Sequence, residues 1–179
     1  MKNLTPVAGA IALGLLIAGP ASAQAQTDLP LYGAPIILED ARTVMNEAEE
    51  VARENKWPVA IAIVDAGGHL VLAARHDNTQ LSAMDLAIGK ARTAIMFKRP
   101  SKALDDVVAA GGGGMRFLAL PGITPLEGGF PIVQDGKIVG AIGVAGSLAS
   151  QNSKIGQAGA EALKATDTTA PDSGKPAEK

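Results

Sequence analysis

The sequence contains no cysteine and very few aromatic residues. Without thiolates, a structural zinc site with four N or S ligands cannot be assembled from one chain that has only two histidines. Aromatic residues are 3% of the 179 residues, so the core must be built from aliphatic side chains, and a base-stacking platform is not expected. The net charge is −2, so the chain also lacks the excess of Lys and Arg that is typical of nucleic-acid-binding proteins. We therefore expect no nucleic-acid partner.

The two histidines lie in one short stretch, DAGGHLVLAARHD, residues 65–77. Side chains alternate between the two faces of a strand, so the seven-residue separation of His69 and His76 places them on opposite faces unless a bulge intervenes. One chain is therefore not expected to clamp a metal ion with both. Each histidine alone can be an axial haem ligand or a solvated residue at a strand end. His76 is the better candidate for haem iron because it stands beside a polar loop.

The first 23 residues have the features of a secretory signal peptide. Lys2 is followed by an apolar run from Val7 to Ala18, which ends at Gly19-Pro20. Ala21-Ser22-Ala23 then supplies a small-x-small cleavage site. The apolar run is shorter than the about 20 residues of a spanning helix. We expect a secreted or periplasmic protein with no membrane association after cleavage.

The remaining chain divides into three parts. Residues 24–34 are expected to be an extended leader, and residues 35–164 a single folded domain. Residues 165–179, ATDTTAPDSGKPAEK, lack apolar periodicity and are expected to be a disordered tail.

Hydrophobic periodicity predicts the order helix, hairpin, helices, hairpin, helix within the domain. Since hairpins give antiparallel pairs, the expected fold is α+β, a single-domain sandwich with a mainly antiparallel sheet and helices packed on it. The expected helices are 38–55, 82–97, 101–110 and 150–164, and the expected hairpins are 59–75 and 130–147.

Several local signals refine this outline. Ser82 can cap the second helix, and Asp135-Gly136 is a strong signal for a type I′ turn. Gly111–Gly114 is expected to be a flexible linker, and the acids Asp105-Asp106 are expected on a solvated helix surface. Gly140, Gly143 and Gly146 indicate a close backbone approach, either by a helix packed across the sheet or by a ligand.

Two loops concentrate polar groups next to the predicted sheet. Arg75-His76-Asp77-Asn78 follows the first hairpin, and Glu127-Gly128-Gly129 precedes the second. If these loops converge with Lys90 or Arg92 of the second helix, they form a pocket for a carboxylate ligand. His76, Asp77 and Glu127 are then the candidates for proton transfer. The spacing alone does not show that they meet.

The sequence resembles the GlcG/HbpS family over about residues 36–163. Three stretches carry the resemblance in the family's order: LEDARTVMNEAEEVARENKWPVAIAIVDAGGHLVLAARHD, AIGKARTAIMFKRPS and EGGFPIVQDGKIVGAIGVAGS. Family members commonly have Arg-Met-Asp-Gly where this chain has Arg75-His76-Asp77-Asn78. The histidine is thus a departure that can create an iron ligand or be a neutral surface change.

The resemblance implies a profilin-like or PAS-like α/β/α sandwich and a homo-oligomer, with hexamers or octamers typical. It also implies haem as a possible ligand, in haem or iron sensing, transport or protection. The family's haem ligand is not a fixed motif, so none is transferred. Two alternatives stay open: an enzyme or binding protein for a small organic acid around Arg75 and Glu127, and a non-catalytic partner module.

Overall fold

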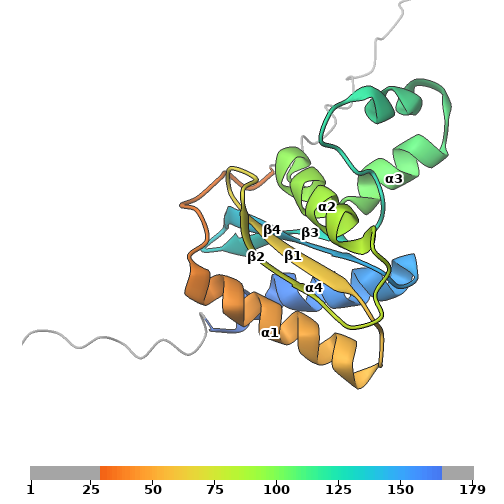
Figure 1. Cartoon of the computed structure of the whole chain (residues 1–179). Coiled ribbons are helices and arrows are strands. Elements are labelled where there is room, and N and C mark those ends of the chain that lie inside the picture. Colours follow the sequence, from red (N-terminus) through yellow and green to blue (C-terminus); the bar gives the residue numbers. More distant parts are fainter. Residues whose placement is uncertain (1–28, 167–179) are drawn as a thin grey trace, which may run out of the picture.

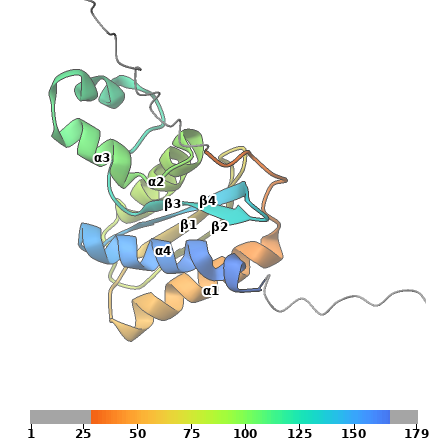
Figure 2. The same cartoon turned by 180° about the vertical axis from the view of Figure 1, so that it is seen from behind.

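The computed structural model describes residues 29–166 as a three-layer α+β sandwich (Figure 1). The helices α1 (Leu38–Glu54) and α4 (Ala149–Thr166) cover one face of a four-stranded sheet. The helix α2 (Ala83–Phe97) covers the other face, and Figure 2 shows the same layering from behind. The predicted fold class is confirmed.

The sheet is antiparallel throughout, with strand order β2-β1-β4-β3. The first hairpin consists of β1 (Ala60–Asp65) and β2 (Leu70–Arg75), and the second of β3 (Gly129–Gln134) and β4 (Lys137–Ala145). The central strands β1 and β4 join the two hairpins. Both central strands are buried on both faces, which explains why they appear in the sequence as continuous apolar runs rather than as alternating patterns.

The close approach predicted from the strand glycines is made by a helix. A Cβ atom added to Gly143 would lie 2.0 Å from the carbonyl oxygen of Ala87 and 2.6 Å from the backbone nitrogen of Ala91. Both atoms belong to α2, so only glycine lets this helix backbone lie directly on β4. The second hairpin also turns as predicted, because Asp135 and Gly136 have the positive φ values of 49° and 72° that a type I′ turn requires.

Two local predictions need correction. Ser82 does precede α2, but its hydroxyl makes no capping hydrogen bond, because its φ and ψ of −69° and −15° are already helical. The run Gly111–Gly114 is not a flexible linker. It enters the 3-10 helix η1 (Gly112–Ala119), which packs beside α3 (Lys102–Ala109). A Cβ atom on Gly114 would lie 2.0 Å from the Val107 carbonyl oxygen, so the glycine permits this packing.

The described part of the leader is hydrogen-bonded to the sheet. Ile138 donates its N–H to the carbonyl of Leu31 and accepts a hydrogen bond from the N–H of Gly33. The Tyr32 hydroxyl donates to the carbonyl of Ile95 at 2.7 Å. The predicted signal peptide lies outside the described residues, as does the predicted tail after Thr166. Within residues 29–166, no helix combines the length and the hydrophobicity that crossing a bilayer needs.

Candidate functional site

The two histidines have separate surroundings. His69 lies in the turn between β1 and β2, where its side chain is 82% exposed and its Nδ1 lies 3.4 Å from Asp65 Oδ1. The same Asp65 oxygen accepts hydrogen bonds from the N–H groups of Gly67 and His69. Burial raises the pKa of Asp65, but these hydrogen bonds and the nearby imidazole outweigh it and lower the pKa. His69 therefore belongs to a turn that Asp65 organises.

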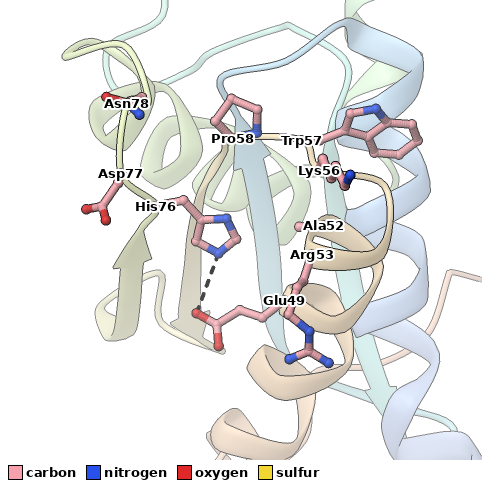
Figure 3. A pocket seen from close by; sticks show the side chains of 9 residues that line it. All are labelled: Glu49, Ala52, Arg53, Lys56, Trp57, Pro58, His76, Asp77 and Asn78. Atoms are coloured by element: carbon pink, nitrogen blue, oxygen red, sulfur yellow. Dashed lines mark ion pairs between the residues drawn. The ribbon is translucent and has the colours of Figure 1, made fainter.

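His76 lies at the opposite end of β2, and its side chain is only 28% exposed. Its backbone N–H donates to the carbonyl of Val59, which continues the hairpin pairing by one step. Its Nε2 lies 3.8 Å from Oε1 of Glu49 on α1 (Figure 3). The strand β2 does contain a bulge, because Ile63 and Val64 of β1 pair with Leu72 and Leu70 and leave Val71 between them. The two histidines still lie at opposite ends of β2. Within residues 29–166, no group of three or more His, Asp or Glu side chains is placed to hold a metal ion.

A cavity of about 530 Å³ opens beside His76. It extends from the imidazole across Ala52 and Pro58 to Trp57, the single tryptophan of the chain (Figure 3). Charged and polar side chains surround this apolar floor. The lining residues are Glu49, Ala52, Arg53, Lys56, Trp57, Pro58, His76, Asp77 and Asn78.

The end of α1 builds this cavity through a Schellman motif. The N–H of Trp57 donates to the Ala52 carbonyl, and the N–H of Lys56 donates to the Arg53 carbonyl. Lys56 occupies the left-handed position with φ 56°, where glycine is the usual residue. The motif reverses the chain, so that Pro58 leads into β1. Because β2 runs antiparallel to β1, it ends where β1 begins and delivers His76 to the same place.

A second, smaller cavity of about 200 Å³ lies at the end of β4, between α2, α3 and the first turn of α4. Lys90, Asp105 and Glu127 contribute charged groups to its wall. Lys90 is 4% exposed, and its Nζ donates a hydrogen bond to the Val144 carbonyl at 3.0 Å. Burial lowers the pKa of Lys90 to about 8, although the carboxylates of Asp105 and Glu127 act in the opposite direction.

The glycines after Glu127 let the backbone pass against Lys90. A Cβ on Gly129 would lie 2.3 Å from the Lys90 carbonyl oxygen, and one on Gly128 would lie 3.3 Å from Lys90 Nζ. Gly128 also has a φ of 124°, which other residues rarely adopt. The buried Ser101 fixes this loop, because its hydroxyl donates to the Leu126 carbonyl and accepts from the Gly129 N–H.

The structure thus divides the predicted site residues between two cavities. Lys90, Glu127 and the two glycines meet around the smaller one, whereas His76 and Asp77 line the larger one. Arg75 is exposed at the end of β2 and lines neither. Arg92 instead donates to the Gly68 carbonyl beside the first turn.

Sequence reasoning missed several residues of both cavities. Glu49 and Trp57 belong to the His76 cavity, and their relation to His76 is purely tertiary. Asp105 is not on a solvated surface as expected, since it is partly buried and accepts a hydrogen bond from the Glu127 N–H at 3.0 Å. In the sequence, Lys56-Trp57-Pro58 marks the end of an amphipathic helix, and that helix end shapes the larger cavity.

Comparison with known proteins places this chain in a family. The family model described as "Haem degrading protein HbpS-like" matches residues 36–161. Protein GlcG of Escherichia coli strain K12 is 39% identical over 104 residues, which are 58% of this chain and 76% of GlcG.

Two crystal structures share the fold. Klebsiella pneumoniae protein ORFY has a TM-score of 0.70 at 25% identity, over 74% of this chain and 93% of ORFY. A PduOC:heme complex has a TM-score of 0.66 at 28% identity, over 73% of this chain and 96% of that one. The family model spans the sheet and both helical layers, and this chain belongs to the HbpS-like family, the GlcG/HbpS group that its sequence resembles.

Proposed function

We propose that this protein binds haem in the larger cavity, where the His76 imidazole would hold the iron. The observation that carries the proposal is a partly buried imidazole on the wall of a cavity that also has an apolar floor. The HbpS-like family and the haem complex of the related PduOC structure support haem as the ligand class. The volume of the His76 cavity, about 530 Å³, lies within the range of small-molecule and cofactor sites.

The residues around His76 suit this role. Histidines that bind metals generally donate their second ring N–H to a carboxylate or carbonyl, which fixes the tautomer. Glu49 faces Nε2 of His76 and can serve in this way, so that Nδ1 is the nitrogen left for iron. Lys56 and Arg53, the latter ion-paired with Glu50, would supply cations for the two propionates of haem. Ala52 and Pro58 would supply apolar contact. Bound haem would contribute the redox and ligand chemistry of its iron.

The single tryptophan makes the proposal directly testable. The purified chain is titrated with hemin while the Soret absorption and the Trp57 fluorescence are recorded. We expect a saturable Soret shift with parallel quenching of Trp57, because the indole lines the same cavity as His76. His76→Ala should weaken binding by at least tenfold and alter the Soret position.

The matched control is His69→Ala, which removes the other imidazole from an exposed turn and should leave both signals unchanged. An unsaturable absorbance rise, or equal effects of the two variants, refutes His76 as the ligand.

We propose further that the protein is exported and acts in haem or iron sensing, transport or protection. The signal-like residues 1–23 support export, and the open, partly exposed position of His76 suits a ligand that must exchange. Mass spectrometry of the protein recovered from the producing cell tests export: an N-terminus at Gln24 is expected, and an intact Met1 refutes it.

We also propose a homo-oligomer, a hexamer or an octamer. The edge strand β2 and the exposed side chains of Leu70 and Leu81, which are 48% and 84% exposed, support a contact between copies. Light scattering after size-exclusion chromatography measures the assembly. A monomeric mass at micromolar concentration contradicts this proposal, and Leu81→Lys is expected to weaken the assembly if this surface forms the contact.

A further inference from the structure

The smaller cavity has a chemical character that haem binding does not explain. Its volume of about 200 Å³ is below the range typical of drug-sized ligands, so it suits a molecule of only a few heavy atoms. Leu86, Leu126 and Ala145 contribute apolar wall, whereas Lys90, Asp105 and Glu127 contribute charge. Three ionisable groups around a small apolar space are typical of a site for acid–base chemistry.

The Lys90 amine is buried without a salt bridge. Among residues 29–166, its Nζ donates to the Val144 carbonyl, and neither Asp105 nor Glu127 lies close enough to pair with it directly. An ammonium group has three donors, so two N–H groups remain for a ligand or water in the cavity. A lysine with a merely structural role would be expected to form a close ion pair at this degree of burial.

The carboxylates beside Lys90 are held in place. The Ser153 hydroxyl donates to Glu127 Oε1 at 2.7 Å, and the Glu127 N–H donates to Asp105 Oδ2 at 3.0 Å. Two carboxylates and at most one ammonium give the cavity a charge of −1 or lower. A carboxylate ligand would be repelled by this charge, whereas an uncharged carbonyl compound would not. The ligand that fits best is therefore a small aldehyde or ketone.

We propose that the Lys90 amine is a nucleophile that forms an imine with a small uncharged carbonyl compound in this cavity. The neutral amine attacks the carbonyl carbon, a C–N bond forms, and the second bond of the carbonyl group breaks. The Glu127 carboxylate accepts the first proton from the nitrogen and passes it to the oxygen, which gives a carbinolamine. The same carboxylate then carries the second nitrogen proton to the hydroxyl, the C–O bond breaks, and water leaves. The balance is one amine and one carbonyl in, and one imine and one water out.

Because the pKa of Lys90 is lowered, part of its amine is neutral near neutral pH. With a pKa of about 8, roughly a tenth of Lys90 is neutral at pH 7, compared with about 0.04% of an ordinary lysine. The neutral fraction of Lys90 at pH 7 is thus about 200-fold that of an ordinary lysine. Lower intrinsic nucleophilicity and restricted access reduce this advantage, so we expect Lys90 to react at least about tenfold faster than exposed lysines.

The test is reductive trapping on the folded, full-length chain. Acetaldehyde is the probe, sodium cyanoborohydride reduces any imine to an ethylamine, and peptide mass spectrometry reports the rate at each lysine. At pH 7, Lys90 should be labelled before the exposed Lys102 and Lys137, and its rate should rise with pH to a midpoint near 8. Labelling confined to exposed lysines while Lys90 stays unmodified overturns the proposal.

Two variants separate reactivity from structure and from haem binding. Glu127→Gln removes a carboxylate that raises the Lys90 pKa, so the midpoint of labelling should move to lower pH while the maximal rate falls. A purely structural role of Glu127 predicts no such shift. His76→Ala should leave Lys90 labelling unchanged, so that failure of the haem proposal and failure of this one are observed independently.

Discussion

Replacement of Gly143 by alanine is the sharpest test of how the sheet positions α2. The added methyl group would lie 2.0 Å from the Ala87 carbonyl oxygen and 2.6 Å from the Ala91 nitrogen. Real Cβ atoms essentially never approach heavy atoms within 3.0 Å, so the helix or the strand must move by about 1 Å. Neither can move freely, because β4 is a central strand and α2 contacts all four strands of the sheet.

The expected loss of stability is the difference between two terms. Overpacking a well-packed core costs about 1–3 kcal/mol, and here the contact is with helix backbone, which has no rotamer to adjust. Alanine is favoured over glycine within a strand by about 0.5–1 kcal/mol, which offsets part of the cost. We expect Gly143→Ala to lower the free energy of unfolding by about 2 kcal/mol, or the melting temperature by roughly 5–10 °C for a domain of this size.

Urea denaturation followed by circular dichroism measures the loss, and Gly136→Ala is the matched control. Gly136 has a φ of 72° but no neighbouring atom within 4 Å of an added Cβ, so it tests backbone strain without a clash. That variant should lose about 1 kcal/mol. A Gly143→Ala protein that is as stable as the wild type, or more stable than Gly136→Ala, would show that α2 does not rest on β4 as described.

Three further predictions concern charged and capping residues. Lys56→Gly should raise the free energy of unfolding by about 0.5–1 kcal/mol in urea denaturation, because glycine adopts the left-handed backbone conformation of this helix end without strain. The same substitution should weaken hemin binding, because it removes a cation from the wall of the His76 cavity. Lys98→Gly at the corresponding position of α2 is the control: it relieves the same backbone strain, loses the contact of the Lys98 ammonium with the Tyr32 ring, and should leave the hemin affinity unchanged. Folding lowers the Lys90 pKa, so the unfolded chain binds more protons than the folded protein between pH 8 and 10. From pH 7 to 10, the free energy of unfolding of the wild type should therefore rise by about 2–3 kcal/mol relative to that of Lys90→Met. Urea titrations at each pH measure this difference. Asp65→Ala should cost about 1–2 kcal/mol at pH 7 in thermal melts. Because folding lowers the Asp65 pKa, the unfolded chain takes up the proton first, so this difference should shrink as the pH falls below the ordinary aspartate pKa of about 4.

The fold was predictable because its signals are local. The apolar stripe of α1, the buried runs of β1 and β4, and the Asp135-Gly136 turn each depend on neighbours in the sequence. The glycines of β4 predicted a close backbone approach by a helix or by a ligand, and at Gly143 the structure shows that α2 makes it. Ser82 shows the limit of such reasoning, because its backbone conformation, which the sequence does not reveal, decides whether its hydroxyl caps the helix.

The candidate sites were predictable only in part because they are tertiary. The sequence suggested one pocket that joined Lys90 and Glu127 to the His76 loop. The structure brings Lys90 and Glu127 together but places His76 in another cavity, and the sequence could not show that the amine is buried. His76 was singled out from its place after a strand, whereas its partner Glu49 comes from a helix 27 positions earlier in the chain. A charge pattern in the sequence places residues on one face of a helix, but it does not show which residues of other elements contact that face.

Both cavities lie at the same end of the sheet, and their positions follow from its topology. The strand β1 begins there, and β2 and β4, which run antiparallel to it, both end there. The end of β2 delivers His76 to one face, while the end of β4 delivers the Val144 carbonyl that holds Lys90 on the other. One hydrogen bond, from the Ser147 hydroxyl to the Pro58 carbonyl, joins residues that line the two cavities. A sheet of two hairpins thus provides two chemically different sites at one end, one built around an imidazole and one around an amine.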